Sequence, residues 1–327
     1  MTMVIYPILL CIIATIIIIL GLIGNILVVY SIYKFNRLST QIRFRLISSL
    51  SIADITVSIF VMPISTAYYY LGKWPLDRYT CLIWNSFDVT CCTSSILHLC
   101  LIATDRYIYI KRPFKYVQFN NNKTVLIQSL LAWIISSLLS FIPIFTNISF
   151  RKSVTDDECR LDVNLTYAFI SSFTSFYIPF AYICFIYYKI YEFSKDMRSK
   201  VINFEPEKTS GQSKIRKDDL KAIKTVGLLV GCFGFCWLPY FIVYLIRAFY
   251  EINPIPNSVD LIVTWIGYLN SGINPIIYCF MQQEFRTAFS RLLASLLPMR
   301  VITEKRNQSF RIMKEYLNQP HEEECLT

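Results

Sequence analysis

Long apolar runs separated by short polar segments make up most of this chain. Seven windows reach the roughly 20 residues that an α-helix needs to cross the hydrocarbon core of a bilayer. The windows span residues 6–31, 44–70, 79–108, 125–146, 166–190, 222–247 and 259–281. The connections are short, and the basic stretch Lys195–Lys217 is the longest of them. The pattern predicts an all-α membrane protein, built as a bundle of seven transmembrane helices.

A shorter apolar pattern follows the seventh window. In residues 283–297, Phe285 and Phe289 recur at helical spacing with arginines between them. This pattern predicts a short amphipathic helix that lies on the inner leaflet. We therefore expect a membrane domain over residues 1–297 that ends in this helix, and a polar cytoplasmic tail over residues 298–327.

Composition and charge agree with a membrane protein. The chain is 54% hydrophobic, and residues 1–33 contain no charged side chain, which favours a spanning helix over a cleaved signal peptide. Most of the 32 Lys and Arg fall in alternate loops and in the tail. The positive-inside rule then puts the N-terminus outside and the C-terminus in the cytoplasm. The net charge of +10 thus orients the protein in the lipid bilayer and does not indicate a nucleic-acid partner.

The outer segments contain two kinds of candidate modification site. Of the 11 cysteines, only Cys81 and Cys159 lie in segments assigned to the oxidising outer face, so these two are the candidates for a disulfide. Asn147 and Asn164 each begin a glycosylation sequon in the loop after the fourth window.

A single carboxylate, Asp88, lies about two turns inside the outer end of the third window. A buried carboxylate needs a partner or loses its charge, and no Lys or Arg occupies the matching depth of another window. A cationic ligand is the natural partner, and aromatic side chains offer cation–π and stacking contacts to it. The further ligand-binding candidates are Cys92, Trp237, Tyr240, Phe241, Tyr244, Trp265 and Tyr268. The pattern predicts a site for a small protonated amine.

Three serines of the fifth window, Ser171, Ser172 and Ser175, add hydroxyl groups. Ser171 and Ser175 are four residues apart and therefore share one face of a helix. They are candidates to bind the same ligand, but Ser in membrane helices also commonly bonds back to a carbonyl of its own helix. Both interpretations apply to each serine.

A second intramembrane carboxylate, Asp54, lies in the second window. Polar side chains of other windows are candidates to surround it: Asn25, Ser95, Asn270, Ser271 and Asn274. Oxygen ligands around a carboxylate suit a small hard cation such as Na⁺, and a hydrogen-bond network with water would satisfy the same groups. We predict an allosteric sodium site at Asp54, Ser95, Asn270 and Asn274 as one of these two alternatives, and no other cofactor.

Charged residues also mark the inner end of the third window, where Asp105, Arg106 and Tyr107 follow one another. Arg106 is 18 residues from Asp88, about five helical turns, so both lie on one stripe roughly 27 Å apart. Arg106 is positioned to pair with Asp105 and with Asp219 of the sixth window, and an ion pair that opens would form a two-state latch. The alternative is an arginine that merely extends to the membrane surface.

Motifs in this order resemble those of the rhodopsin-like (class A) G-protein-coupled receptors over nearly the whole chain. The motifs are Gly24-Asn25, Leu50–Asp54, Cys81 with Cys159, Asp105–Tyr107, Trp133, Phe233–Pro239 and Asn274–Tyr278. Three stretches resemble the biogenic-amine branch. DVTCCTSSILHLC is similar to serotonin receptors, SSFTSFYIP to D1-type dopamine and trace-amine receptors, and TWIGYLNSGINPIIY to serotonin, β-adrenergic and trace-amine receptors.

The resemblance implies a role for several residues at the ligand end of the bundle. Asp88 would be the counter-ion of the amine, and Trp237 would sense the agonist at the floor of the pocket. The connector below the pocket would consist of Ile96, Pro179 and Phe233.

At the cytoplasmic end the resemblance implies coupling to a heterotrimeric G protein. Arg106, Tyr187 and Tyr278 would rearrange to open a cleft for the Gα C-terminus, and Phe114 would pack into a pocket on Gα. Kinases and arrestin are expected as further partners.

We therefore expect a plasma-membrane receptor, not an enzyme, for a small amine of the serotonin, catecholamine or trace-amine type, which raises cAMP through Gs. A receptor for a peptide or a lipid is the main alternative. A transporter would show inverted repeats, and none is visible. A membrane enzyme would need a nucleophile–base pair or a metal cluster, and the intramembrane histidine, His98, has no second ligand near it in the sequence.

Overall fold

A computed structural model describes the chain over most of its length. The described residues are 2–112, 116, 121–146, 159, 163–204, 210–250 and 255–296. At several helix ends, among them 196–204 and 210–223, the description is of the backbone alone.

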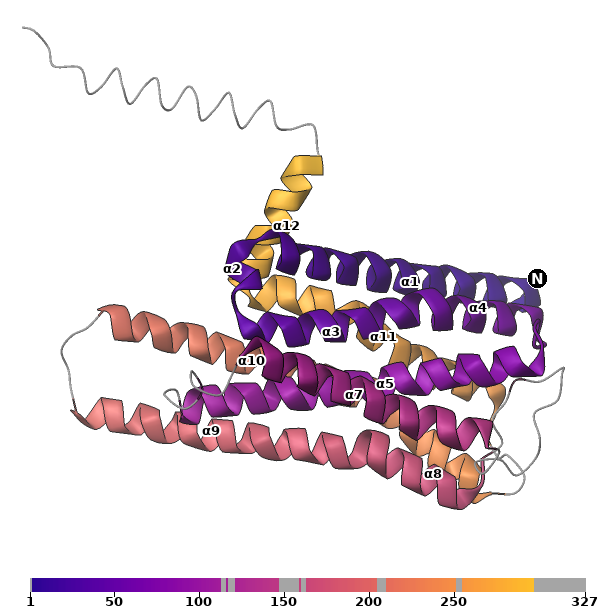
Figure 1. Cartoon of the computed structure of the whole chain (residues 1–327). Helices are drawn as coiled ribbons and strands as arrows, with labels where there is room; N and C mark the ends of the chain where they lie inside the picture. Colours follow the sequence, from indigo (N-terminus) through magenta and orange to yellow (C-terminus); the bar gives the residue numbers. More distant parts are fainter. Residues whose placement is uncertain are drawn as a thin grey trace, which may run out of the picture.

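Helices account for nearly all of the described residues; the long helices lie side by side, and α12 leaves the bundle at a steep angle to them (Figure 1). In chain order they are α1 (Thr2–Lys34), α2 (Asn36–Ser39), α3 (Ile42–Thr56), η1 (Val57–Val61), α4 (Met62–Leu71), α5 (Arg78–Lys111), α7 (Asn122–Phe145), α8 (Leu165–Ser172), η2 (Phe173–Tyr177), α9 (Ile178–Phe204), α10 (Ser210–Phe249), α11 (Asn257–Met281) and α12 (Gln283–Leu296). The elements α3, η1 and α4 form one continuous helix, and α8, η2 and α9 form another.

Six helices in the described part of the chain are long and apolar enough to cross a membrane. They are Leu10–Lys34, Ile42–Leu71, Arg78–Lys111, Asn122–Phe145, Leu165–Phe193 and Gly227–Phe249. The helix α11 has 25 residues and packs against both α1 and α10. Polar residues such as Asn270 and Asn274 lower the mean hydropathy of α11, and these residues are buried within the bundle. The predicted seven-helix bundle is confirmed.

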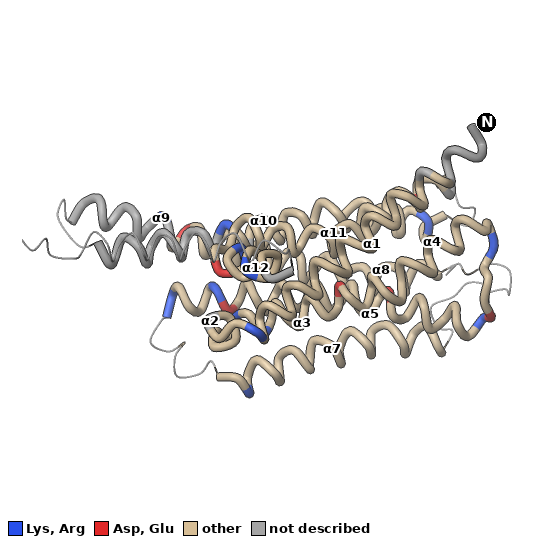
Figure 2. The backbone as a smooth tube through the Cα atoms, turned by 90° about the horizontal axis from the view of Figure 1, so that it is seen from above, with Lys and Arg blue, Asp and Glu red and all other residues tan. Residues whose placement is uncertain are grey.

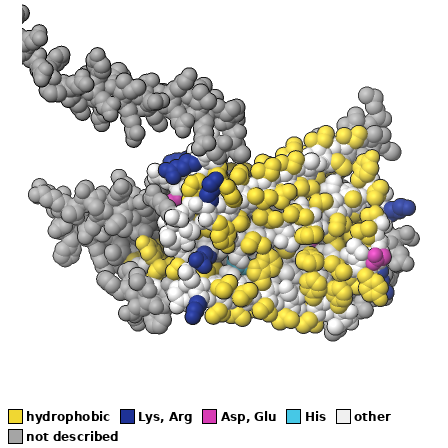
Figure 3. All heavy atoms as spheres, turned by 45° about the horizontal axis from the view of Figure 1, so that its top comes forward, with side chains coloured by type: hydrophobic (Ala, Val, Ile, Leu, Met, Phe, Trp, Pro, Cys, Tyr) yellow, Lys and Arg dark blue, Asp and Glu magenta, His cyan; other side chains and the backbone are white. Residues whose placement is uncertain are grey.

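The outer surface of the bundle is apolar, as a lipid-facing surface must be. Hydrophobic side chains cover most of the described face shown in Figure 3. Lys, Arg, Asp and Glu gather near the two ends of the described helices, and the middle is almost free of them (Figure 2). Exposed apolar residues on four different helices illustrate this: Ile12, Leu126, Ile178 and Phe235.

One expected boundary needs correction. The stretch Lys195–Lys217 does not form one long loop, because α9 continues to Phe204 and α10 begins at Ser210. Hydropathy measures how long a segment is apolar, whereas a helix continues into water when its polar residues favour it. At the C-terminal end α12 reaches Leu296, and it buries Phe285 and Phe289 while its arginines are exposed. The amphipathic helix is confirmed over the described residues, and position 297 and the tail lie outside them.

Polar caps begin three of the helices. Asp77, Asn121 and Asn164 each accept a hydrogen bond from the backbone N–H three residues further on, at 2.8–2.9 Å. Such a bond satisfies one of the free amides of the first turn. Because the bonds from Thr80 favour the charged form, they hold the pKa of Asp77 below its usual range. At the other end of a helix, Gly72 ends α4 with φ 67°, a left-handed conformation that glycine adopts without strain.

Two π-helical segments interrupt the membrane helices, and the sequence pattern did not predict them. Each ends two residues before a proline: η1 before Pro63 and η2 before Pro179. A π-helical turn contains one extra residue and appears often at functional sites. The indole N–H of Trp84 in α5 donates to the carbonyl of Val61, the last residue of η1, at 3.0 Å. Both segments also pack against α5.

Candidate ligand-binding site

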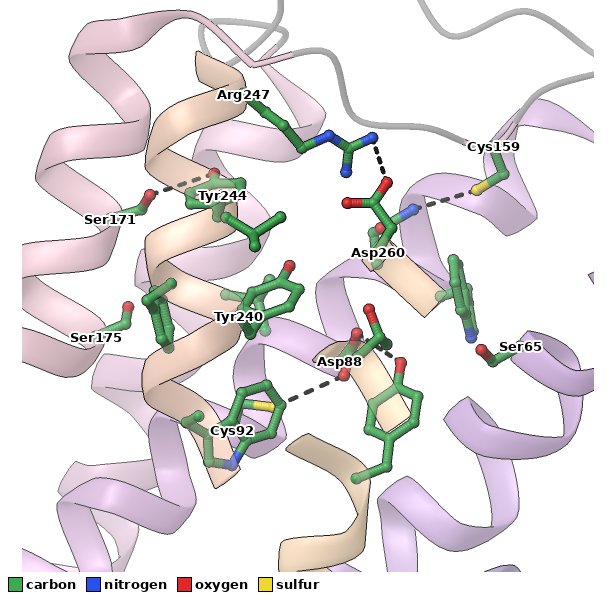
Figure 4. A pocket seen from close by; sticks show the side chains of 18 of the residues that line it. Ser65, Asp88, Cys92, Cys159, Ser171, Ser175, Tyr240, Tyr244, Arg247 and Asp260 are labelled. Carbon is green, nitrogen blue, oxygen red and sulfur yellow. Dashed lines mark hydrogen bonds and ion pairs between the residues drawn. The ribbon is translucent and has the colours of Figure 1, made fainter. Parts of the chain in front are cut away.

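A cavity of about 470 Å³ opens between α4, α5, α8, η2, α10 and α11. This volume falls within the range of small-molecule sites. Most of the predicted ligand-binding residues line it: Asp88, Cys92, Ser171, Ser175, Trp237, Tyr240, Phe241, Tyr244 and Tyr268. Figure 4 shows how the labelled side chains converge on the cavity from opposite helices.

Asp88 of α5 is the central polar group of this cavity. Its Oδ2 atom accepts a hydrogen bond of 3.0 Å from the hydroxyl of Tyr268, and the thiol of Cys92 donates to Oδ1 at 3.7 Å. Both donors are neutral, and in the described part of the structure no cation pairs with Asp88. The carboxylate is half-buried, so one side of it faces the cavity. A cation that enters the cavity would meet a preformed anion.

Aromatic rings form the inner end and one wall of the cavity. The ring of Trp237 meets Tyr240 edge-on, with centroids 5.7 Å apart. The rings of Tyr240 and Tyr244 stack at 6.0 Å, and Phe241 stacks on Phe176 of η2 at 4.5 Å. This packing fixes the ring positions, so the wall is rigid and offers both ring faces and ring edges to a ligand.

Two of the three predicted serines face the cavity and one does not. Ser171 and Ser175 line the cavity, whereas Ser172 is fully buried, its hydroxyl has no described hydrogen-bond partner, and it does not line the cavity. The reason is rotation, because one residue along a helix turns the side chain by about 100°. Ser171 also bonds to the carbonyl of Ala168 at 3.3 Å. The alternative of back-bonding thus applies to Ser171, which also lies 3.5 Å from the hydroxyl of Tyr244.

The placement of Trp265 corrects a second expectation. Its ring does not line the cavity and instead meets the edge of Tyr268, with centroids 5.5 Å apart. Trp265 therefore supports the ring that bonds to Asp88 and does not itself face the ligand space.

Sequence reasoning missed a charged pair at the outer end of the same cavity. Arg247 of α10 and Asp260 of α11 form an ion pair of 2.5 Å, and both line the cavity. In the sequence each residue looks like an ordinary charge at the end of an apolar window. Their pairing depends on how two helices are rotated, which no spacing along the chain reports.

The predicted disulfide is present, since Cys81 is bonded to Cys159. The amide of Asn85, one turn after Cys81 in α5, donates to the sulfur of Cys159 at 3.2 Å. Cys159 and Asn85 both line the cavity. Of the two sequons, Asn147 lies outside the described residues and Asn164 caps α8, so glycosylation stays a prediction at both.

Asp54 lies in the middle of the bundle, at the predicted sodium site. Its Oδ2 accepts a hydrogen bond of 2.8 Å from Asn274, and its buried Oδ1 has no partner among the described residues. Ser95, Asn270 and Ser271 are buried as well. Asn25 departs from expectation, because its amide donates to the carbonyls of Gly21 and Ser271 and not to Asp54.

The inner end of α5 contains the predicted ion pair. Arg106 binds the neighbouring Asp105, which also accepts a hydrogen bond of 2.8 Å from Tyr116. Tyr107 instead accepts a bond of 2.7 Å from Lys111. The side chain of Asp219 lies outside the description, and so does Phe114.

Most of the remaining predicted activation residues belong to the main hydrophobic core or pack against it, and one of them, Phe233, also lines the cavity. Ile96 and Phe233 are buried, and Pro179 accepts a thiol contact of 3.7 Å from Cys100. Tyr278 is fully buried and stacks on Phe285 of α12. The hydroxyl of Tyr187 is buried without a described partner.

Comparison with known proteins places this geometry in a family. The model of the 7 transmembrane receptor (rhodopsin family) matches residues 24–278. The chain therefore belongs to the rhodopsin-like (class A) family of seven-transmembrane receptors, in the group that contains the biogenic-amine receptors. This fold and these apolar helices indicate a multi-pass protein of the plasma membrane.

Three relatives show which receptors the chain resembles. It is 34% identical to the octopamine receptor beta-1R of Drosophila melanogaster, over 88% of this chain and 62% of that protein. It is 34% identical to the alpha-1A adrenergic receptor of Oryzias latipes, over 84% and 64%, and 32% identical to the octopamine receptor beta-2R of Chilo suppressalis, over 85% and 78%. The chain thus spans less than two thirds of the length of the first two.

These comparisons confirm the resemblance to amine receptors and the expectation that the chain is not an enzyme.

Proposed function

We propose that this protein is a plasma-membrane receptor for a small protonated amine, with Asp88 as the counter-ion of its ammonium group. One observation carries the proposal: a half-buried carboxylate faces a 470 Å³ cavity and has only neutral described partners, Tyr268 and Cys92. A cation is the ligand that such a carboxylate favours. The relatives, which are named as octopamine and adrenergic receptors, support an amine over a peptide or a lipid.

The cavity also suggests how an arylalkylamine would lie. With its ammonium at Asp88, its ring would rest against Trp237 and Phe241, where aromatic contacts are available. Polar groups on the ring would then reach Ser171 and Ser175 on the opposite wall. Serotonin-type, catecholamine-type and trace-amine-type ligands share the ammonium group and the aromatic ring, and they differ in the polar groups on the ring.

The receptor would signal through a heterotrimeric G protein, with Gs and a rise in cAMP as the proposed output, and with kinases and arrestin as regulators. The agonist would favour a state in which Arg106 leaves Asp105, because a ligand shifts an equilibrium only by its differential affinity. The connector Ile96, Pro179 and Phe233 lies between the two ends. The N-terminus would be outside and the C-terminus cytoplasmic.

We also propose that Na⁺ binds beside Asp54. Two buried oxygens without described partners, Oδ1 of Asp54 and Oδ1 of Asn270, fit a cation ligand set, which Ser95 and Asn274 would complete. The ion would neutralise the negative charge of the buried Asp54 carboxylate. Asp54→Asn should abolish any dependence of agonist affinity on sodium, measured by titration of NaCl against a constant total of NaCl and choline chloride. An unchanged dependence would remove sodium from this site.

The decisive experiment replaces Asp88 by asparagine, which keeps the shape of the side chain and removes its charge. In transfected cells, cAMP would be measured with a panel of biogenic and trace amines. We expect the potency of every active amine to fall at least 100-fold, at unchanged surface expression. Asp77→Asn is the matched control, because asparagine also caps a helix and Asp77 lies outside the cavity. An undiminished response of Asp88→Asn would contradict the amine-receptor proposal.

A further inference from the structure

The cavity contains more charge than a simple amine requires. Of the described residues that line it, three are charged: Asp88, Arg247 and Asp260. Figure 4 shows Arg247 and Asp260 near the end where Cys159 lies, whereas Asp88 lies deeper, near Cys92. The cavity therefore has a second carboxylate, and that carboxylate is already neutralised by an arginine.

The position of the Arg247–Asp260 ion pair in the structure stabilises it. The guanidinium and the carboxylate are 2.5 Å apart, and their side chains are only 24% and 12% exposed. Asp260 lies in the first turn of α11, where the helix dipole favours an anion, and Arg247 lies in the last turn of α10, where it favours a cation. Removal of either partner would leave the other charge largely buried beside the ligand space.

The two carboxylates lie at different depths of the cavity (Figure 4). Tyr268, which holds Asp88, and Asp260 are eight residues apart on α11. At 1.5 Å per residue the separation is about 12 Å along the helix axis. A ligand whose ammonium lies at Asp88 can thus place its far end beside Asp260 without leaving the cavity.

We propose that Arg247 is a specificity-determining residue that makes the receptor select amines with one positive charge over amines with two. With Arg247 in place, the three charged lining residues sum to one negative charge, which a single ammonium matches. Without it, Asp260 becomes a second cation site at the far end of the cavity. The inference rests on the proposed function, because it uses Asp88 as the anchor of the first ammonium. The favoured ligand is an elongated monoamine with a neutral far end.

Three matched probes test this charge rule. Each is 2-phenylethylamine with a para chain of four heavy atoms in its longest path: 3-aminopropyl, n-butyl or 2-carboxyethyl. The ammonium end is the same in all three, and the far end is positive, neutral or negative. Dissociation constants would be obtained from the ligand-induced rise in melting temperature of the purified full-length receptor, which requires no signalling.

Wild type should bind the butyl probe most tightly. In Arg247→Gln, the dissociation constant of the aminopropyl probe relative to that of the butyl probe should fall at least fivefold. In Asp260→Asn, the dissociation constant of the carboxyethyl probe relative to that of the butyl probe should fall at least fivefold, because Arg247 then lacks the Asp260 carboxylate. The double variant should regain the preference for butyl, and Arg247→Lys should retain it. The two single variants test the rule independently if one of them folds poorly.

A shift below fivefold in the variants that fold, or a shift that persists in the double variant, would overturn the inference. Asp88→Asn separates the two levels of the argument. If Asp88→Asn weakens all three probes while Arg247→Gln leaves their ratios unchanged, the charge rule is wrong and the amine receptor stands. If Asp88→Asn leaves the affinity for the butyl probe unchanged, both proposals fail.

Discussion

The tightest fits between individual residues occur where rings of α9 meet glycines of α10. A methyl group on Gly227 would lie 2.5 Å from the hydroxyl oxygen of Tyr187, and one on Gly234 would lie 2.5 Å from Cζ of Phe180. The two glycines are seven residues apart on α10, and the two rings are seven residues apart on α9. Seven residues make two helical turns, so the contacts repeat along one face of each helix. The missing side chain of each glycine thus leaves the space that the ring occupies.

Gly227→Ala should therefore destabilise the protein. The added methyl would displace the ring of Tyr187, and overpacking of this kind costs about 1–3 kcal/mol. Gly231→Ala is the matched control on the same helix, because nothing lies within 4 Å of the added Cβ and alanine favours a helix over glycine. Thermal unfolding of the purified receptor should show a lower melting temperature for Gly227→Ala and no decrease for Gly231→Ala. Equal melting temperatures would contradict the tight fit.

Single residues also show what sequence could and could not predict about the site. Asp88 was predictable because an isolated carboxylate in an apolar window demands a partner. Tyr268 was a candidate only as an aromatic wall, and its hydrogen bond to Asp88 was not predicted. Ser172 and Trp265 were candidates because their residue type fits a ligand site, but they do not line the cavity, since side-chain type does not report rotation about the helix. Arg247 and Asp260 were missed because their pairing is a property of two helices.

At the scale of the element, the π-helical segment η1 depends on a bond from another helix. Trp84 of α5 donates to the carbonyl of Val61 at 3.0 Å. Trp84→Phe removes the donor and keeps an aromatic ring, so we expect the free energy of unfolding to fall by about 1 kcal/mol, and by up to about 3 kcal/mol if the buried carbonyl finds no other partner. Chemical denaturation would measure it.

Trp265→Phe is the control for Trp84→Phe, because the same change is made where the indole lies against Tyr268 outside the cavity. A loss no greater than that of Trp265→Phe would show that the Val61 carbonyl does not need this donor.

The elements themselves were predictable to different degrees. Every membrane window corresponds to a helix, because twenty apolar residues in a bilayer must satisfy their backbone internally. The helical continuation of α9 and α10 beyond the apolar part was not predictable from hydropathy. The π-helical segments were not predictable either, since a proline indicates that a helix is distorted without saying how.

At the scale of the whole molecule, one covalent link spans much of the chain. The disulfide joins Cys81 in the first turn of α5 to Cys159, 78 residues further on. In the chain-entropy account, a loop of this length contributes about 4 kcal/mol of stability. Cys81→Ser should lower the melting temperature and reduce surface delivery, measured by flow cytometry on unpermeabilised cells.

Cys184→Ser is the control for the disulfide, because Cys184 is an exposed free cysteine on α9. It should be delivered like wild type. If Cys81→Ser reached the surface at the same level as Cys184→Ser and melted at the same temperature, the bridge would contribute nothing to the stability of the fold.

The π-helical segment Phe173–Tyr177 can also be described as a change in chain length. A π-turn accommodates one residue more than an α-turn of similar rise, so the segment amounts to a one-residue insertion in the fifth membrane helix. Loss of that residue would turn Ser171 by about 100° relative to α9 and away from the cavity. A relative with a regular helix there would align with a gap of one residue. In such a relative, the serine that matches Ser171 by counting back from Pro179 would not be the one that faces the ligand.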